Sequence, residues 1–174
     1  MNTIRYGLKN CYYCVKGEET PKRLPGAVNL SLTADIDVIT KKTATGIEFP
    51  IAVNDNGYDG SLEIATIPET FASDILGIYR DENNVLCRRK QQLKMFTLLF
   101  ETSGSEKIRY SLQNCYCIIP DLESSTIADK PEVNTSKINI KVIPCPCDTE
   151  KAIIKQIKEK DNPTIFKDWF NKIY

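Results

Sequence analysis

The cysteines are the residues of this chain whose type and spacing could do chemistry. The sequence of 174 residues contains seven cysteines and no histidine. Six of the cysteines form close pairs, namely Cys11 with Cys14, Cys115 with Cys117, and Cys145 with Cys147. Thiolates at short spacing on turns are common ligands of structural zinc, so the first and third pairs are a candidate metal site. A small cytosolic zinc-binding adaptor that uses these four thiols is therefore one open hypothesis.

Buried, unliganded thiols are the favoured interpretation of the same residues. Cys115 and Cys117 flank Tyr116 in an apolar run typical of a strand, where cysteine behaves as a small hydrophobe. The first ten residues lack the apolar core of a secretory signal, and an odd cysteine count without export argues against a disulfide framework. We therefore expect no bound metal and no cofactor.

Catalytic motifs are sparse. Without histidine, the Ser-His-Asp and Cys-His arrangements are excluded, and the commonest general base is missing. The sequence has no glycine-rich phosphate loop, and the acidic residues of DILGIYRDENN lack the spacing of a calcium loop. A carboxylate pair assembled by the fold stays open, but we expect no enzyme. No apolar run approaches the roughly 20 residues that span a bilayer, so no membrane partner is expected.

Charge is distributed in blocks, although the formal net charge is zero. Residues 47–82 carry eight acidic groups and one basic group, whereas residues 83–110 carry six basic groups and two acidic groups. Ordinary solvated surface is one interpretation. The other is a set of complementary patches that orient identical subunits against each other. The basic residues form no stripe interleaved with aromatics, so nucleic-acid recognition is weakly supported.

Alternating apolar residues predict at least six strands, in a mainly β fold of β-sandwich or open-barrel type. Val28, Leu30 and Leu32 alternate in GAVNLSLTADIDVIT, and Pro50 confines GIEFPIAV to a sheet edge or a bulge. The dipeptide Asn56-Gly57 predicts a two-residue hairpin turn into a strand over 60–67. TSGS predicts a second hairpin between LKMFTLLFE and EKIRYSLQNCYCII. Ile138, Ile140 and Val142 alternate in SKINIKVI.

Two helices complete the expected elements. Residues 68–77 form the first, flanking the sheet, with Pro68 in the first turn, Phe71 and Ile75 in an apolar stripe, and Gly77 at the end. A short C-terminal helix follows from PTIFKDWFNKIY, whose aromatic residues have helical spacing. Residues 151–160 fit either a helix or a strand.

The chain is expected to form a single domain over residues 1–174. Three polar or proline-punctuated segments are less core-like: an N-terminal loop (about 16–25), a long loop (about 120–136) and a C-terminal extension (about 151–174). We expect these segments to contact other subunits rather than to fold back on their own core.

Six segments resemble, in order, the major tail protein of long-tailed bacteriophages, the phi13-type tail-tube family. They are YGLKN (6–10), LPGAVNLSL (24–32), NGYDGSLEIATIPETFASDILG (56–77), YSLQNC (110–115), IPCP (143–146) and FKDWFNKIY (166–174). The third segment is the most specific, and together they touch the chain from end to end. The sequence departs from the family at the paired cysteines.

The resemblance implies a structural protein of the virion tail, assembled in the host bacterial cytoplasm. It implies a β-sandwich with one flanking helix, forming stacked hexameric rings around a channel for DNA passage during viral genome ejection. The implied partners are further copies of the chain, the tape measure, tail terminator and distal tail proteins, and double-stranded DNA that passes without specific binding.

A channel for DNA suggests where the charges should lie. Double-stranded DNA carries one negative charge per roughly 1.7 Å of its axis, so an acidic or neutral wall should let it pass. Because Leu62 and Ile64 take one strand face for the core, Glu63 and then Asp59 are the lumen-facing candidates. Alternatively, Glu63 pairs across a ring interface with the assembly candidates Arg88, Arg89 and Lys90.

Overall fold

The fold is mainly β, as the sequence predicts. The structure, a computed structural model, describes residues 5–104, 106–120, 135–145 and 152–174. Ten strands and three short helical segments lie in these residues: β1 (Arg5–Val15), β2 (Lys22–Arg23), β3 (Ala27–Lys42), β4 (Glu48–Ile64), α1 (Glu69–Phe71), a π-helical turn η1 (Ala72–Leu76), β5 (Ile78–Arg80), β6 (Leu86–Arg88), β7 (Phe96–Gly104), β8 (Ile108–Cys117), β9 (Ser136–Val142), β10 (Ile154–Lys158) and α2 (Pro163–Asp168).

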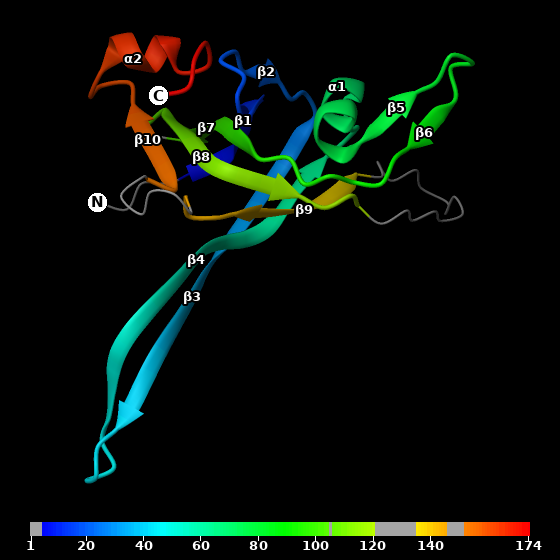
Figure 1. The fold of residues 1–174 in the computed structure, drawn as a ribbon. Helices are drawn as coiled ribbons and strands as arrows, with labels where there is room; N and C mark the ends of the chain where they lie inside the picture. The colour runs from blue at the N-terminus through cyan, green and yellow to red at the C-terminus, as the bar shows by residue number, and fades with distance from the viewer. Residues whose placement is uncertain (1–4, 105, 121–134, 146–151) are drawn as a thin grey trace, which may run out of the picture.

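One large antiparallel sheet organises the molecule. Its strand order is β2-β1-β7-β8-β9-β4-β3, and β10 pairs with the first half of β8, while β9 pairs with the end of β8. β5 and β6 form a separate two-stranded hairpin. The β3–β4 hairpin runs far beyond the rest of the sheet (Figure 1). The hairpin predicted from TSGS joins β7 to β8 and is confirmed.

Strand alternation places the core on one face of this sheet. Leu62 and Ile64 of β4 lie beside Ile138, Ile140 and Val142 of β9 in the buried cluster, so the alternation predicted for both strands is confirmed. The same face of β7 and β8 contributes further buried residues, including Leu98, Phe100, Ile108, Tyr110 and Leu112. Burial of these side chains is the main source of stability for the body.

The helical segment α1–η1 covers the core face, close to the expected bounds. Phe71, Ala72, Ile75 and Leu76 are all buried, as the predicted stripe requires. Gly77 ends the segment with a φ of 71°, a left-handed conformation that glycine adopts without steric cost. Pro68 stands one position earlier than expected, as the extended residue before the helix.

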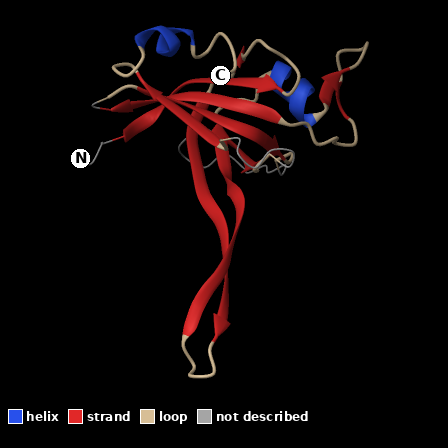
Figure 2. Ribbon diagram, turned by 60° about the vertical axis from the view of Figure 1, so that its left-hand side comes forward, coloured by secondary structure: helices blue, strands red, loops and turns tan. Residues whose placement is uncertain are grey.

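The C-terminal residues fold back on their own sheet, contrary to expectation. Of the two alternatives left open for residues 151–160, the structure has the strand, β10, at residues 154–158. α2 follows and lies over the face of the sheet opposite the core, where Phe170 stacks on Tyr12 with ring centroids 4.6 Å apart. The indole nitrogen of Trp169 donates to the carbonyl of Tyr110 at 3.3 Å. Aromatic burial on the parent sheet explains why this segment does not project (Figure 2).

Part of the N-terminal loop also returns to the body. β2 pairs with Tyr12 and Tyr13 of β1, and the Leu24 amide donates to the carbonyl of Cys11 at 2.8 Å. The Lys22 ammonium lies 2.8 Å from the Asp74 carboxylate. The expected projection of residues 16–25 is therefore wrong for Lys22 to Leu24. The third segment, 120–136, lies almost entirely outside the described residues.

The predicted hairpin turn at Asn56-Gly57 is wrong. β4 passes straight through this dipeptide, and the chain reverses instead at residues 43–47, where Thr43 and Ile47 share a backbone hydrogen bond of 2.9 Å. Gly57 has a φ of 92°, which serves a β-bulge rather than a turn. Pro50 also lies at a register shift, on the outer part of β4 that pairs only with β3, as its lack of an N–H predicts.

Candidate assembly surface

The most exposed part of the molecule is a two-stranded arm, defined here as residues 35–57. β9 pairs with β4 from Tyr58 to Ile64, so beyond Tyr58 the strands β3 and β4 have no further partner strand among the described residues. Pairing continues to Lys42 and Glu48, which extends the arm about 20 Å past Ile36. Figure 2 shows the arm projecting from the body. An isolated two-stranded ribbon is marginally stable in water, so the arm lacks the support that a sheet normally gives.

The bulge at Asn56-Gly57 determines which side chains share a face of the arm. Ala34 pairs with Tyr58 and Ile36 pairs with Asp55, so β4 uses one more residue than β3 between these pairs. The extra residue switches the side-chain alternation of β4. The core face of the body, which includes Leu62, therefore continues along the arm as Ile36, Val38 and Val53.

These three residues form an apolar arm face that the described residues leave uncovered. Ile36, Val38 and Val53 are 51 %, 55 % and 65 % exposed, and Val38 and Val53 are direct cross-strand partners. Asp55 lies on the same face, opposite Ile36. Exposed apolar side chains that stand together typically mark an interaction surface rather than free solvent contact.

The opposite face of the arm carries a hydrogen-bonded polar cluster near the body, and Ile39 and Phe49, 51 % and 42 % exposed, lie on the same face further out. The Asn54 amide donates to Asn56 at 3.0 Å, and the Asn56 amide donates to Asp37 at 3.2 Å. Near the tip, on the strand face of Ile36 and Val38, Lys42 and Glu48 form an ion pair of 3.3 Å. Exposed apolar side chains thus lie on both faces of the arm, mixed with charged and amide groups.

The arm face of Asp37 and Asn54 continues into a polar face of the body, and both lumen candidates lie on that face of the body. Asp59 forms an ion pair with Lys141 at 2.8 Å, and Glu63 stands across from Lys137 and accepts a hydrogen bond from Thr135. The proximity of Asp59 raises the pKa of Lys141. The two acidic residues alternate with Ser61, away from the buried Leu62, as the strand pattern predicts. The two carboxylates face two ammonium groups, so this part of the face is electrically balanced.

The assembly candidates lie on a second projection, the lobe of residues 78–94, which contains the β5–β6 hairpin. Arg88 is exposed at the end of β6, and Lys90 is exposed just beyond it. Arg89 is held differently, because its guanidinium lies 4.1 Å from the centre of the Tyr79 ring and its amide donates to Gly77. Among the described residues, no ion pair joins these cations to Glu63.

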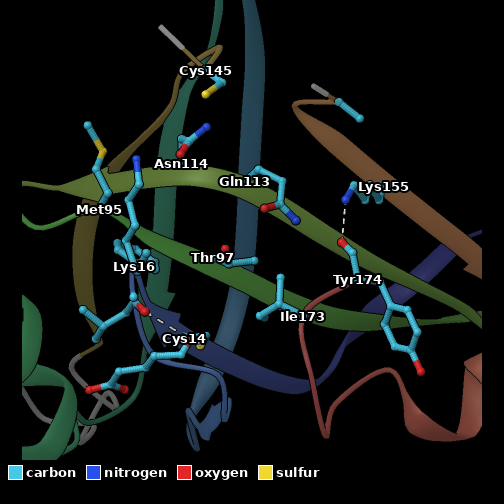
Figure 3. A pocket seen from close by; sticks show the side chains of 15 residues that line it. Cys14, Lys16, Met95, Thr97, Gln113, Asn114, Cys145, Lys155, Ile173 and Tyr174 are labelled. Carbon is cyan, nitrogen blue, oxygen red and sulfur yellow. Dashed lines mark hydrogen bonds between the residues drawn. The ribbon is translucent and has the colours of Figure 1, made fainter. Parts of the chain in front are cut away.

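The candidate zinc ligands are not brought together. Cys11 belongs to the core cluster, whereas Cys14 lies on the opposite face of β1. Cys14 and Cys145 line one cavity of about 460 Å³, together with Gln113 and Asn114 (Figure 3). Cys147 lies outside the described residues. In the part of the chain that the structure describes, no three Cys, Asp or Glu side chains form a group that could hold a metal ion.

Burial makes the thiols of Cys11, Cys115 and Cys117 poor nucleophiles. Burial raises the pKa of both Cys11 and Cys117 to about 12, and it raises that of Cys115 as well. Cys115 and Cys117 lie on the core face, as the strand pattern predicts. The thiolate, which is the nucleophile and metal ligand, is therefore disfavoured at these positions.

The apolar arm face is the feature that sequence reasoning missed. Its signal was present, because the alternation of Val28, Leu30 and Leu32 continues through Ile36 and Val38. With a turn at Asn56-Gly57, β4 would not pair with the outer part of β3, and Val53 would not be expected beside Val38.

Comparison with protein-family models and with curated proteins finds no match to the chain. None of the helices in the described residues is long and apolar enough to cross a membrane.

Proposed function

We propose that this protein is a structural subunit of a phage tail tube, which assembles with copies of itself into stacked rings that enclose a channel for DNA. The single observation that carries the proposal is the projecting arm with its exposed apolar side chains. Its apolar face continues the core face of the body, yet the described part of the chain supplies nothing to cover it. A second subunit is the simplest cover for a surface that every copy presents.

Open sheet edges support the same proposal. β3 stands at one end of the strand order, so its outer edge has no neighbouring strand among the described residues. Unpaired edges normally favour uncontrolled association, and proteins protect them with charges, bulges or covering segments. In a subunit that must associate, the same edge is a means of assembly. Contacts between different surfaces of identical subunits generate rings or open filaments.

The balanced polar face suits the wall of a DNA channel. Asp59 and Glu63 lie beside Lys141 and Lys137, and a wall without excess positive charge would not hold DNA by its phosphates. The proposal therefore assigns this face to the lumen. Glu63→Lys should permit tube formation but slow DNA ejection, because it adds positive charge beside Lys137. At a ring interface, the same change should block ring formation. A Glu63→Lys virion that assembles and ejects normally would refute both roles.

Electron microscopy of an arm-shortened variant tests the function. Replacing residues 37–54 by Asn-Gly joins the cross-strand partners Ile36 and Asp55 through a two-residue turn. The wild-type protein at high concentration should form hollow tubes. The variant should stay monomeric and folded, with a circular dichroism spectrum that loses only the strand signal of the arm, because residues 37–54 contribute nothing to the buried cluster. Wild-type protein that stays monomeric at all concentrations, or a shortened variant that forms normal tubes, would contradict the proposal.

A further inference from the structure

A second surface has the composition to receive the arm. The lobe of residues 78–94 exposes Val85, Leu86 and Leu93, which are 55 %, 59 % and 64 % exposed. Leu86 of β6 is the cross-strand partner of Arg80 in β5. It shares a strand face with Arg88, two residues further along β6. Apolar side chains thus stand beside a cation on the lobe, as Ile36 and Val53 stand beside the anion Asp55 on the arm.

The lobe is a preformed surface. The Asp81 carboxylate accepts hydrogen bonds from the amides of Asn83 and Val85, at 2.9 and 2.8 Å, which fixes the turn between β5 and β6. Arg80 reaches back to Glu69, at 2.6 Å, and fastens the hairpin to α1. A surface that is rigid before contact loses less conformational entropy on binding.

The charges of the two surfaces are opposite. Residues 78–94 contain five basic groups and two acidic groups, whereas the arm contains four acidic groups and two basic groups. Arg80 is neutralised by Glu69, and Lys42 by Glu48. The Asp55 carboxylate accepts a hydrogen bond from the Gly57 amide at 2.8 Å, and neither Asp55 nor Arg88 forms an ion pair within the described residues.

The lobe and the arm of one chain cannot meet. In both ribbon views the lobe projects beside α1 from the upper part of the body, and the arm projects downward (Figures 1 and 2). A contact between them therefore has to join two copies.

We propose that the apolar arm face of one subunit docks on the lobe of the next, with Ile36, Val38 and Val53 against Val85 and Leu86, and Asp55 against Arg88. This inference rests on the proposed self-assembly and names the receiving surface. The contact joins two different surfaces of the same chain, so it is heterologous and propagates from copy to copy. Complementary charge sets the register and speeds the encounter, while the apolar residues supply the affinity.

Photo-crosslinking tests the location of the contact. Leu86 is replaced by benzoylphenylalanine in the full chain, and the assembled protein is irradiated as a mixture of ¹⁵N-labelled and unlabelled copies. We expect mixed-isotope cross-links between residue 86 and peptides from residues 35–57. The matched control carries the probe at Ile118, which is also exposed but lies at the end of β8. Cross-links from residue 86 to any other surface, or none in assembled protein, would overturn the inference.

Charge reversal tests the pairing independently. Arg88→Glu alone and Ile36→Lys alone should each raise the concentration needed for assembly about tenfold, because each places like charges in the contact. An equimolar mixture should recover assembly to within about twofold of wild type, because alternating copies form only two kinds of contact. One joins the unchanged arm to the unchanged lobe, and the other joins the arm changed by Ile36→Lys to the lobe changed by Arg88→Glu, where the charges are opposite. Ile36 is used because it forms no side-chain hydrogen bond, and circular dichroism checks that each variant is folded.

The outcomes separate this inference from the proposed function. Single variants that assemble like wild type, or a mixture that fails to recover, would show that the arm docks elsewhere. The tail-tube proposal would survive either result, provided that wild-type protein forms tubes and the arm-shortened variant does not. Failure of the wild-type protein to assemble would instead remove the basis of both.

Discussion

Removal of Arg109 should release the C-terminal helix from the sheet. Its guanidinium lies between two aromatic rings, 4.0 Å from the centre of Phe166 and 4.5 Å from that of Phe170. The same group donates to Glu101 at 2.8 Å and to the backbone carbonyl of Phe166. One side chain of β8 thus joins β7 to α2. We choose Arg109→Met, because methionine keeps much of the volume and removes the charge.

The magnitude follows from burial of the ion pair. The side chains of Arg109 and Glu101 are only 16 % and 10 % exposed, so Arg109→Met leaves a carboxylate with little access to water. Breaking a buried pair from one side costs about 3–5 kcal/mol, and the lost ring contacts add to this. The double variant Arg109→Met/Glu101→Leu removes both charges, so most of that cost should disappear and about 1–2 kcal/mol should remain.

Urea denaturation of the arm-shortened monomer measures both values without interference from assembly. Limited proteolysis supplies a local readout, because α2 should be cleaved faster in the single variant than in the parent protein. Lys107→Met is the matched control: Lys107 is an exposed cation near the start of β8 and pairs with Glu159 at 3.4 Å. A loss below about 1 kcal/mol for Arg109→Met, or equal losses for the single and double variants, would refute the reasoning.

Three further variants or conditions test the fold. Phe71→Asp places a charge where a fully buried ring contacts two other rings edge to face, so it should cost several kcal/mol in urea denaturation; a fully folded, equally stable variant would show that Phe71 faces outward. Gly57→Ala should lower the free energy of unfolding by at least about 2 kcal/mol, because a Cβ would lie 2.0 Å from a backbone oxygen. Gly46→Ala is the control, with a similar φ but open space around it, and should cost only about 1 kcal/mol. Equal losses for the two variants would contradict the bulge geometry. The pKa values of Cys11 and Cys117 are raised to about 12, so their protonated thiols stabilise the fold fully below the unfolded value of about 8.5, and this contribution is lost as the pH rises towards 12. Stability measured between pH 8 and 11 should therefore fall, and rapid labelling of these thiols in folded protein at pH 8 would contradict the assignment.

Local sequence determined the elements whose residues are close along the chain. The helix at 68–77 follows from Phe71 and Ile75 at helical spacing and from Gly77, whose left-handed backbone ends it. The β7–β8 hairpin follows from two apolar runs joined by a short polar turn. Strand alternation likewise placed Glu63 on the face away from Leu62. Each of these inferences depends on steric and burial preferences within a few residues.

Tertiary structure decided the rest, because pairing partners distant in sequence selected among conformations that the local residues allow equally. Asn56-Gly57 supplies a positive φ that suits a hairpin turn or a bulge. The carbonyl of Val142, against which Gly57 packs, and the continuous register of β3 with β4 select the bulge. Residues 154–158 became a strand because the edge of β8 was available beside them. Cys11 and Cys14 form a zinc-like motif in sequence, but their backbone is part of a strand that directs them to opposite faces. The sequence shows the composition of residues 35–57. Only the fold shows that they form an exposed arm, because β4 has no partner strand other than β3 beyond Tyr58 among the described residues.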